Sequence, residues 1–471
     1  MSAFLPDLPN ELLCALAAYL PDLGDLAALL RTNRQLHSHL NSELYKCDAR
    51  NKEKSRAIPW AVQHGRFDTL RHISTASASH WRAKGMTVLH LAATYNQKAM
   101  AEAFLDLPSI GVDDKEDQGF TALHLAAASG SVEVAKVLLD KGADPNVLCE
   151  SDEISPLGLA SMFGSIEVAE LLLQHGADVN EGDAEQPPLF YAVGNEKTDV
   201  VKLLLEHGAS MEFPSTEPGC TTALIQAANL GHADIVATLI SHGADPLQSD
   251  TNGDTPLSMA IATTGKRRVE AVQMLLKNGA EAELTQNGGI TALRQAVGSA
   301  ADAQRRAWDE DADPDTEKES LELVRLLLDH GAVASASDDH GTALHCAVTL
   351  NYQKIAELLL RNNVPVNATN SEGMTALHFA VSPRCSLSPD ECVDMVQLLV
   401  SNGADARALD NRGQTPLHIA AGLSLEISEI LLKVSNAVAD DNVLAARDYT
   451  GRTALHNSAR FLQRNDHEAT P

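Results

Sequence analysis

Apolar residues in the middle of this chain recur at the spacing of an α-helix. Two i, i+4 stripes pair Val134 with Leu138 and Ala135 with Leu139. A short alanine-rich segment precedes them, with Thr121 as a good N-cap and Gly130 at a position that suits positive φ. Gly142 follows the stripes and can end the second segment in the same way. The pattern predicts one helix over 122–129 and a second over 132–141.

The phrase that opens this helix pair recurs along the chain. Its copies begin eleven times, at 87, 121, 155, 187, 222, 255, 291, 342, 375, 415 and 453, as in TVLHLAA, TALHLAA and TPLHIAA. A helix pair of this size cannot bury both of its apolar stripes alone, so each unit must stack between its neighbours. The fold class is therefore expected to be all-α, an α-solenoid of about eleven to twelve repeats.

The repeated residues resemble the ankyrin repeat. T-A/P-L-H-x-A opens the unit, and GAD closes its second helix at 142, 176, 243 and 403 but is lost at NNVP, 362–365. The resemblance covers 85–471, with insertions near 300–319 and 382–391. A connector over 51–84 holds a degenerate first repeat at 57–73, which keeps the helix–Gly–helix rhythm without the opening phrase.

One histidine per repeat could suggest metal ligands, but no two of these stand at ligand spacing. The ankyrin resemblance implies instead that each one bonds the threonine three residues earlier and ties adjacent loops. They are therefore expected to be structural: His90, His124, His345, His378, His418 and His456. A second set, His175, His207, His242 and His330, stands at the ends of second helices, where a donor suits the last carbonyls.

The first 50 residues do not share the repeat. Apolar residues at i, i+4 spacing between 5 and 44 predict three short amphipathic helices, too small a core to stand alone. The segment resembles an F-box, and the arrangement of an F-box before ankyrin repeats is typical of a fungal-type F-box protein. By that resemblance it would dock on the Skp-family adaptor of a cullin-RING ubiquitin ligase through Leu8, Pro9, Leu12, Leu16 and Leu26.

A simpler hypothesis is that these leucines only cap the N-terminal end of the solenoid, because a terminal repeat needs a partner with a polar outer face. The charged stretch KCDARNKEKSRA at 46–57 looks more like an exposed connector, which favours docking. The sequence RTNRQLHSHL departs from the F-box pattern, since many F-boxes carry Val-Cys/Ser and Trp near the third helix.

Charge divides the chain. Residues 1–84 carry 11 Lys+Arg and 8 Asp+Glu, a net +3, so the remainder holds 25 and 56, a net −31. Such a field repels nucleic acid and anionic membrane and favours a protein target with a basic surface. The seven scattered cysteines and an N-terminus without a basic signal region predict an intracellular protein, cytoplasmic and/or nuclear.

The ankyrin resemblance places the target-binding surface at hairpin tips and at the exposed ends of first helices. Consensus-like repeats carry small or polar residues at those helix ends, so Met162 beside Phe163 indicates a contact patch. Packing between repeats explains any one of these residues equally well. The candidates are Asp152, Ile154, Met162, Phe163, Asn229, Leu230, Asn252 and Asp254.

Catalytic and cofactor motifs fail at required positions. ATTGKRRV at 262–269 lacks the first glycine of a phosphate loop, since Ala260 stands there, and is expected to be a solvated loop. DEDADPDTE at 309–317 has Pro314 where a calcium loop needs glycine. We therefore expect no enzyme activity, no cofactor and no metal. The sequence predicts a non-enzymatic adaptor that joins a target protein to a ubiquitin ligase, with a plain scaffold as the alternative.

Overall fold

The computed structural model describes residues 57–66, 81–150, 153–182, 186–212, 222–263, 267–283, 290–298, 316–382, 389–421, 424–436 and 443–459. The chain divides into two compact units, Met1–Thr216 and Glu217–Pro471, and each is described by itself. The predicted F-box-like module, 1–50, lies outside the described residues, as does Asp152.

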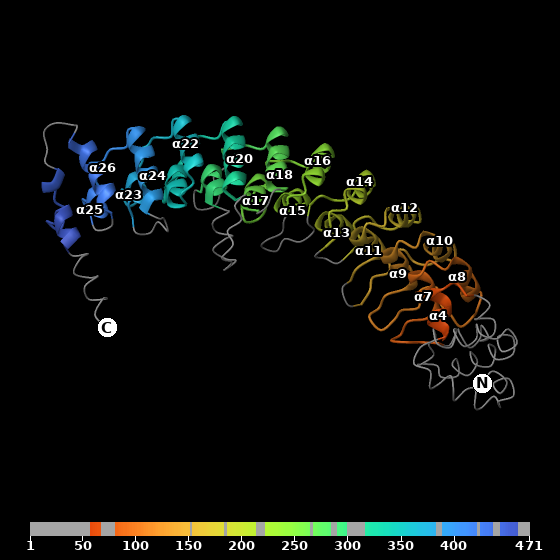
Figure 1. The fold of residues 1–471 in the computed structure, drawn as a ribbon. Helices are drawn as coiled ribbons and strands as arrows, with labels where there is room; N and C mark the ends of the chain where they lie inside the picture. Colours follow the sequence, from red (N-terminus) through yellow and green to blue (C-terminus); the bar gives the residue numbers. More distant parts are fainter. Residues whose placement is uncertain are drawn as a thin grey trace, which may run out of the picture. The chain divides into compact units, whose positions relative to one another are not determined.

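The first unit is a stack of helix pairs. First helices pack on first helices, as α7, α9, α11 and α13 do, and second helices α8, α10, α12 and α14 form a parallel row (Figure 1). Helix α4, in the segment predicted to be a degenerate repeat, packs on α7. The bounds are α4 Ala57–Gln63, α7 Val88–Thr94, α8 Lys98–Leu105, α9 Ala122–Ser129, α10 Val132–Asp140, α11 Pro156–Phe163, α12 Ile166–Gln174, α13 Pro188–Gly194 and α14 Thr198–Glu206.

The second unit repeats this arrangement, with α16, α18, α20 and α22 as successive second helices (Figure 1). A two-residue hairpin pairs β1, Ser337–Asp338, with β2, Gly341–Thr342. The helices are α15 Ala223–Asn229, α16 Ala233–Ser241, α17 Pro256–Ala262, α18 Arg267–Lys277, α20 Thr316–Asp329, α21 Ala343–Thr349, α22 Gln353–Arg361, α23 Ala376–Ala380, α24 Pro389–Ser401, α25 Pro416–Ala420, α26 Leu425–Asn436 and the 3-10 turn η1 Val443–Ala445, and residues 292–298 and 454–459 are also helical.

Local sequence accounts for both ends of α9 and for the C-terminal end of α10. Helix α9 has the predicted bounds, with Thr121 as its N-cap and Gly130 in the left-handed region at φ 66°. Helix α10 ends at Asp140, one residue before the predicted end, and Gly142 follows it at φ 87°. Small alanines on the first helices let neighbouring pairs approach closely, and their leucines fill the space between pairs.

The histidine of the repeated phrase bonds in two directions. His124 Nδ1 lies 2.9 Å from Thr121 Oγ1 and accepts the Thr121 main-chain N–H at 3.1 Å, which completes a capping box. Its Nε2 lies 3.1 Å from the carbonyl oxygen of Ile154, in the hairpin of the next repeat. The same two links occur at His90, His345, His378 and His418, while His456 has the link to its own threonine, Thr453.

The second set of histidines closes the second helices. In each, Nδ1 lies 2.8 or 2.9 Å from the carbonyl oxygen four residues earlier, so an imidazole N–H can donate to one of the last helical carbonyls. These residues are His175, His207, His242 and His330.

The expectation that ATTGKRRV forms a solvated loop is wrong for its last three residues. Residues 267–269 open α18, and Arg268 is only 1% exposed. Its Nη2 donates to Ser320 Oγ at 3.2 Å and its Nε lies 3.6 Å from Glu319 Oε2, both on α20. Arg268 is buried because an acceptor set on the neighbouring second helix compensates the loss of water.

Candidate target-binding surface

The exposed ends of the first helices carry the largest apolar side chains of the predicted surface. Phe163 is the last residue of α11, 56% exposed, and stands eight positions after Ser155, which opens its repeat. Leu230 stands eight positions after Thr222, at the C-cap of α15, and is 39% exposed. The eighth position after the start of the phrase is therefore exposed in both units.

In the first unit, the structure separates the candidates. Met162 is half-buried beside exposed Phe163, whereas the Ile154 side chain lies in the core. Its Cγ1 would be 2.8 Å from a Cβ placed on Gly158, and its main-chain carbonyl bonds His124. The Ile154 side chain therefore packs beneath the surface and is not accessible to a partner.

Phe163 is exposed because the chain turns directly after it. Gly164 takes φ 78° at the C-cap of α11, and the alkyl chain of Lys197 lies across this glycine, with Cδ 2.8 Å from where a Cβ would be. The turn ends the helix directly after Phe163 and leaves its phenyl ring exposed. An exposed aromatic at such a fixed position can serve as an anchor for a partner.

In the second unit, the remaining candidates come from adjacent repeats. Asn229 and Asn252 are exposed, and Asp254 is half-buried. Thr263 Oγ1 donates to the carbonyl oxygen of Asn229, which ties the ends of α15 and α17 side by side. Asp250 Oδ1 accepts the main-chain N–H groups of Asn252 and Asp254 at 2.8 and 2.9 Å, so the hairpin is a rigid turn.

The carboxyl of Asp254 is electrostatically perturbed. Its partial burial, followed by the nearby charge of Asp250, raises the pKa of Asp254 above its usual range. A cation placed against this hairpin would favour the charged form of Asp254, which agrees with a partner that carries basic residues.

Sequence reasoning missed Tyr95. It is the C-cap of α7, 40% exposed, eight positions after Thr87 and thus equivalent to Phe163 and Leu230. Counting eight residues from every copy of the phrase would have found it. In the first unit, this position therefore reads Tyr95, Ser129, Phe163 and Asn195 across four successive repeats.

Exposed acids lie in the hairpins of the same unit. Asp117, Glu150, Glu153 and Glu181 are exposed, and Glu150 Oε1 lies 3.5 Å from Lys115 Nζ. Aromatic anchors beside acidic hairpin tips form a surface suited to a basic segment with large apolar side chains.

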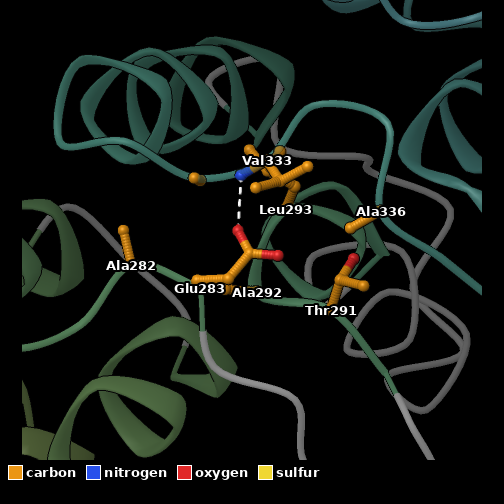
Figure 2. A pocket seen from close by; sticks show the side chains of 8 residues that line it. Ala282, Glu283, Thr291, Ala292, Leu293, Val333 and Ala336 are labelled. Carbon is orange, nitrogen blue, oxygen red and sulfur yellow. Dashed lines mark hydrogen bonds between the residues drawn. The ribbon is translucent and has the colours of Figure 1, made fainter.

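A small-molecule site is not evident among the described residues. A shallow hollow of about 160 Å³ lies between the loops after α18 and α20, and Figure 2 shows the Glu283 carboxylate reaching the main-chain N–H of Val333 there. The hollow is lined by Ala282, Glu283, Thr291, Ala292, Leu293, Ala332, Val333 and Ala336.

No three His, Cys, Asp or Glu side chains in the described ranges converge as a metal ion would require. Across the same ranges, none of the helices combines the length and the apolar character needed to cross a membrane.

Comparison with known proteins agrees with the repeat geometry. A family model described as ankyrin repeats (3 copies) matches residues 58–149, 147–215, 211–287, 316–393 and 385–468. The chain belongs to the ankyrin repeat family. It is thus an ankyrin repeat protein–protein interaction domain built as a solenoid of helix pairs.

Relatives within the ankyrin family share only part of this chain. It is 28% identical over 225 residues to the E3 ubiquitin-protein ligase KEG of Arabidopsis thaliana, covering 42% of this chain and 14% of that protein. It is 34% identical over 164 residues to neurogenic locus notch homolog protein 1 of Danio rerio, covering 31% and 6%. The crystal structure of the human ASB11 ankyrin repeat domain is similar at 26% identity and a TM-score of 0.39, covering 47% of this chain and 96% of that domain.

Proposed function

We propose that this chain is a non-enzymatic adaptor in which the ankyrin array binds a target protein and residues 1–50 dock on a ubiquitin ligase core. The observation that carries the proposal is the rigid row of repeats with exposed Tyr95 and Phe163 at equivalent first-helix ends. Such a surface can hold a protein segment with large apolar side chains. Transfer of ubiquitin would take place on other subunits.

The link to ubiquitin transfer rests on the F-box-like pattern of residues 5–44. Its proposed partner is the Skp-family adaptor of an SCF-type cullin-RING ligase, contacted through Leu8, Leu12 and Leu26 among others. Similarity to the E3 ligase KEG supports the association of such an array with ubiquitin transfer, although it spans 14% of that protein.

The proposed target carries a basic surface. The net charge of −28 and the exposed acids of the hairpins would steer a cationic protein toward the array and repel nucleic acid and anionic membrane. We propose that the protein is located in the cytoplasm, the nucleus, or both. The alternative function is a plain ankyrin scaffold, in which the leucines of residues 5–44 serve as an N-terminal cap.

Calorimetric titration of the purified full chain with a Skp-family adaptor tests the docking proposal. We expect saturable binding with a micromolar or lower Kd, lost in Leu12→Asp and kept in Phe163→Asp, which places the same charge on the array. A folded wild-type chain that shows no binding would leave the scaffold as the better account.

A further inference from the structure

The first helices of the first unit carry a continuous apolar row. The residues four and eight positions after the start of each phrase share a face of the helix, because i and i+4 are neighbours there. The fourth position is apolar in four successive repeats and is at least half-buried, so it forms the floor of this face. Its members are Leu91, Leu125, Leu159 and Tyr191.

The eighth position adds a large ring in every second repeat. Tyr95 at the end of α7 is 40% exposed and Phe163 at the end of α11 is 56% exposed. Ser129 and Asn195, at the same position of the other two repeats, are small and polar. Helix α9 packs between α7 and α11, so the two rings stand two helix spacings apart. At 8–10 Å between packed helices, this separation is roughly 16–20 Å.

An extended segment matches this spacing. Its residues rise about 3.3 Å each and alternate between two faces, so about six residues return a side chain to the same face after roughly 20 Å. An α-helix laid along the row would repeat its apolar stripe about every 10 Å, at i and i+7, and would set a large side chain over Ser129 as well. The alternation of rings with small polar residues therefore favours the extended form.

The opposite edge of the same face is acidic. Helix α9 has eight residues and is about 12 Å long, and the hairpins lie at the end of the helices away from the rings. Asp117, Glu150, Glu153 and Glu181 are exposed in three successive hairpins, and Lys115 neutralises part of this charge at Glu150. A segment that lies over the apolar floor therefore meets rings on one side and acids on the other.

We propose that the first unit binds a basic segment in extended conformation, with large apolar side chains at i and i+6 and lysine or arginine at the alternate positions between them. The apolar side chains contact Tyr95 and Phe163, and the cations reach toward the acidic hairpins. This inference rests on the proposed target-binding role of the array and is independent of docking on a ligase.

Fluorescence anisotropy of labelled synthetic peptides with the purified full chain tests the spacing. The probe has about 15 residues, with tryptophan at i and i+6, lysine at i+1, i+3 and i+5, and serine elsewhere. We expect saturable binding that weakens about tenfold or more when the second tryptophan is moved to i+7. This peptide has the same composition, but its second tryptophan points to the other face.

Two variants separate the ring from simple charge attraction. Phe163→Asp adds a negative charge and would strengthen a merely electrostatic association with a basic peptide, whereas loss of the ring should weaken binding about tenfold or more. Asn195→Asp is the matched control, because it places the same charge at the equivalent position of a repeat without a ring. It should leave binding unchanged or slightly tighter. Circular dichroism should show that both variants keep their helices.

Three results would overturn the inference: no binding of the i, i+6 peptide, equal binding of the i, i+7 peptide, or undiminished binding by Phe163→Asp. The titration with the Skp-family adaptor is read separately. Adaptor binding without peptide binding would remove this inference and leave the ligase role standing. Peptide binding without adaptor binding would support it on a plain scaffold.

Discussion

At the scale of single residues, the histidine of the repeated phrase acts as a neutral linker. Its Nδ1 accepts the main-chain N–H of the threonine, so the ring proton is on Nε2 and is donated to the next hairpin. Burial lowers the pKa of His90, His345 and His378, and lowers that of His124 to about 4. A protonated ring would lose the first of these bonds.

The lowered pKa values predict acid sensitivity. An unfolded histidine titrates near pH 6.5, so between about pH 6.5 and 4 the unfolded chain binds more protons than the folded one. The stability contributed by these groups is complete above about pH 6.5 and falls by up to about 1.4 kcal/mol per pH unit for each histidine below it. Urea midpoints measured across this range should fall with pH.

A histidine outside the capping boxes gives the control. His340→Asn, at an exposed position, should leave the pH slope unchanged, and His124→Asn should flatten it. Urea midpoints that stay constant from pH 7 to pH 5 would contradict the assignment of neutral, buried histidines.

Two arginines form ion pairs that link neighbouring repeats. Arg294 occupies the histidine position of its phrase and pairs with Asp338 of the next hairpin, whose side chain is 2% exposed. Arg268 on α18 pairs with Glu319 on α20. Both pairs tie the repeat that carries the acidic insertion to a neighbour, which suggests that they fix its register.

Removing one partner of the buried pair should be costly. Arg268→Met leaves Glu319 without its cation and should destabilise the second unit by about 3 kcal/mol, while Arg268→Met with Glu319→Met should recover part of that loss. Arg361→Met removes an exposed pair with Glu357 and should cost below about 0.5 kcal/mol. Equal urea midpoints for the two arginine variants would show that the buried Arg268 pair contributes no more to the free energy of unfolding than the exposed pair.

At the scale of the helix pair, periodicity and end signals predict most of the structure. The bounds of α9 match the prediction and α10 differs by one residue, because Thr121, Gly130 and Gly142 mark the ends locally. The burial of Ile154 and Arg268 could not be predicted in the same way. Their burial depends on Gly158, Glu319 and Ser320, which only the packed structure brings to them.

The repeat that reads NNVP where others read GAD keeps its turn by another residue. In NNVP, Asn363 takes φ 61°, the conformation that glycine adopts at this position elsewhere. Asparagine tolerates this region better than other residues with a Cβ. Asn363→Ala should therefore destabilise the second unit by about 1 kcal/mol, while Asn363→Gly should be neutral or stabilising. Equal thermal midpoints for the two variants would contradict a turn held at positive φ.

At the scale of the whole molecule, each repeat depends on its neighbours for burial. Leu344 is fully buried between adjacent first helices, whereas Leu455 holds the equivalent position and is exposed. Leu344→Ala should cost about 2–5 kcal/mol and speed hydrogen exchange in its own and the adjacent repeats. Leu455→Ala should change neither stability nor exchange, because Leu455 is exposed. Exchange rates raised equally across the whole second unit would show that the unit unfolds as one block.

The proposed binding function depends on which surface side chains are exposed, and periodicity alone does not specify that. Periodicity indicates where a partner can bind, at the residue eight positions after the start of each phrase, and thereby finds Phe163 and Leu230. It does not say which of these side chains remain exposed, and Ile154 shows that a neighbouring apolar candidate can be core. The proposed ligase partner rests on residues 1–50, where the sequence alone carries the argument.

The most direct test of the adaptor account is reconstitution of a ligase core. The purified full chain is mixed with a Skp-family adaptor and a cullin, and the complex is followed by size-exclusion chromatography with light scattering. We predict that the chain co-elutes with both proteins in equal stoichiometry, that Leu12→Asp elutes alone, and that Phe163→Asp still enters the complex. A folded wild-type chain that elutes apart from the adaptor and the cullin would contradict the account.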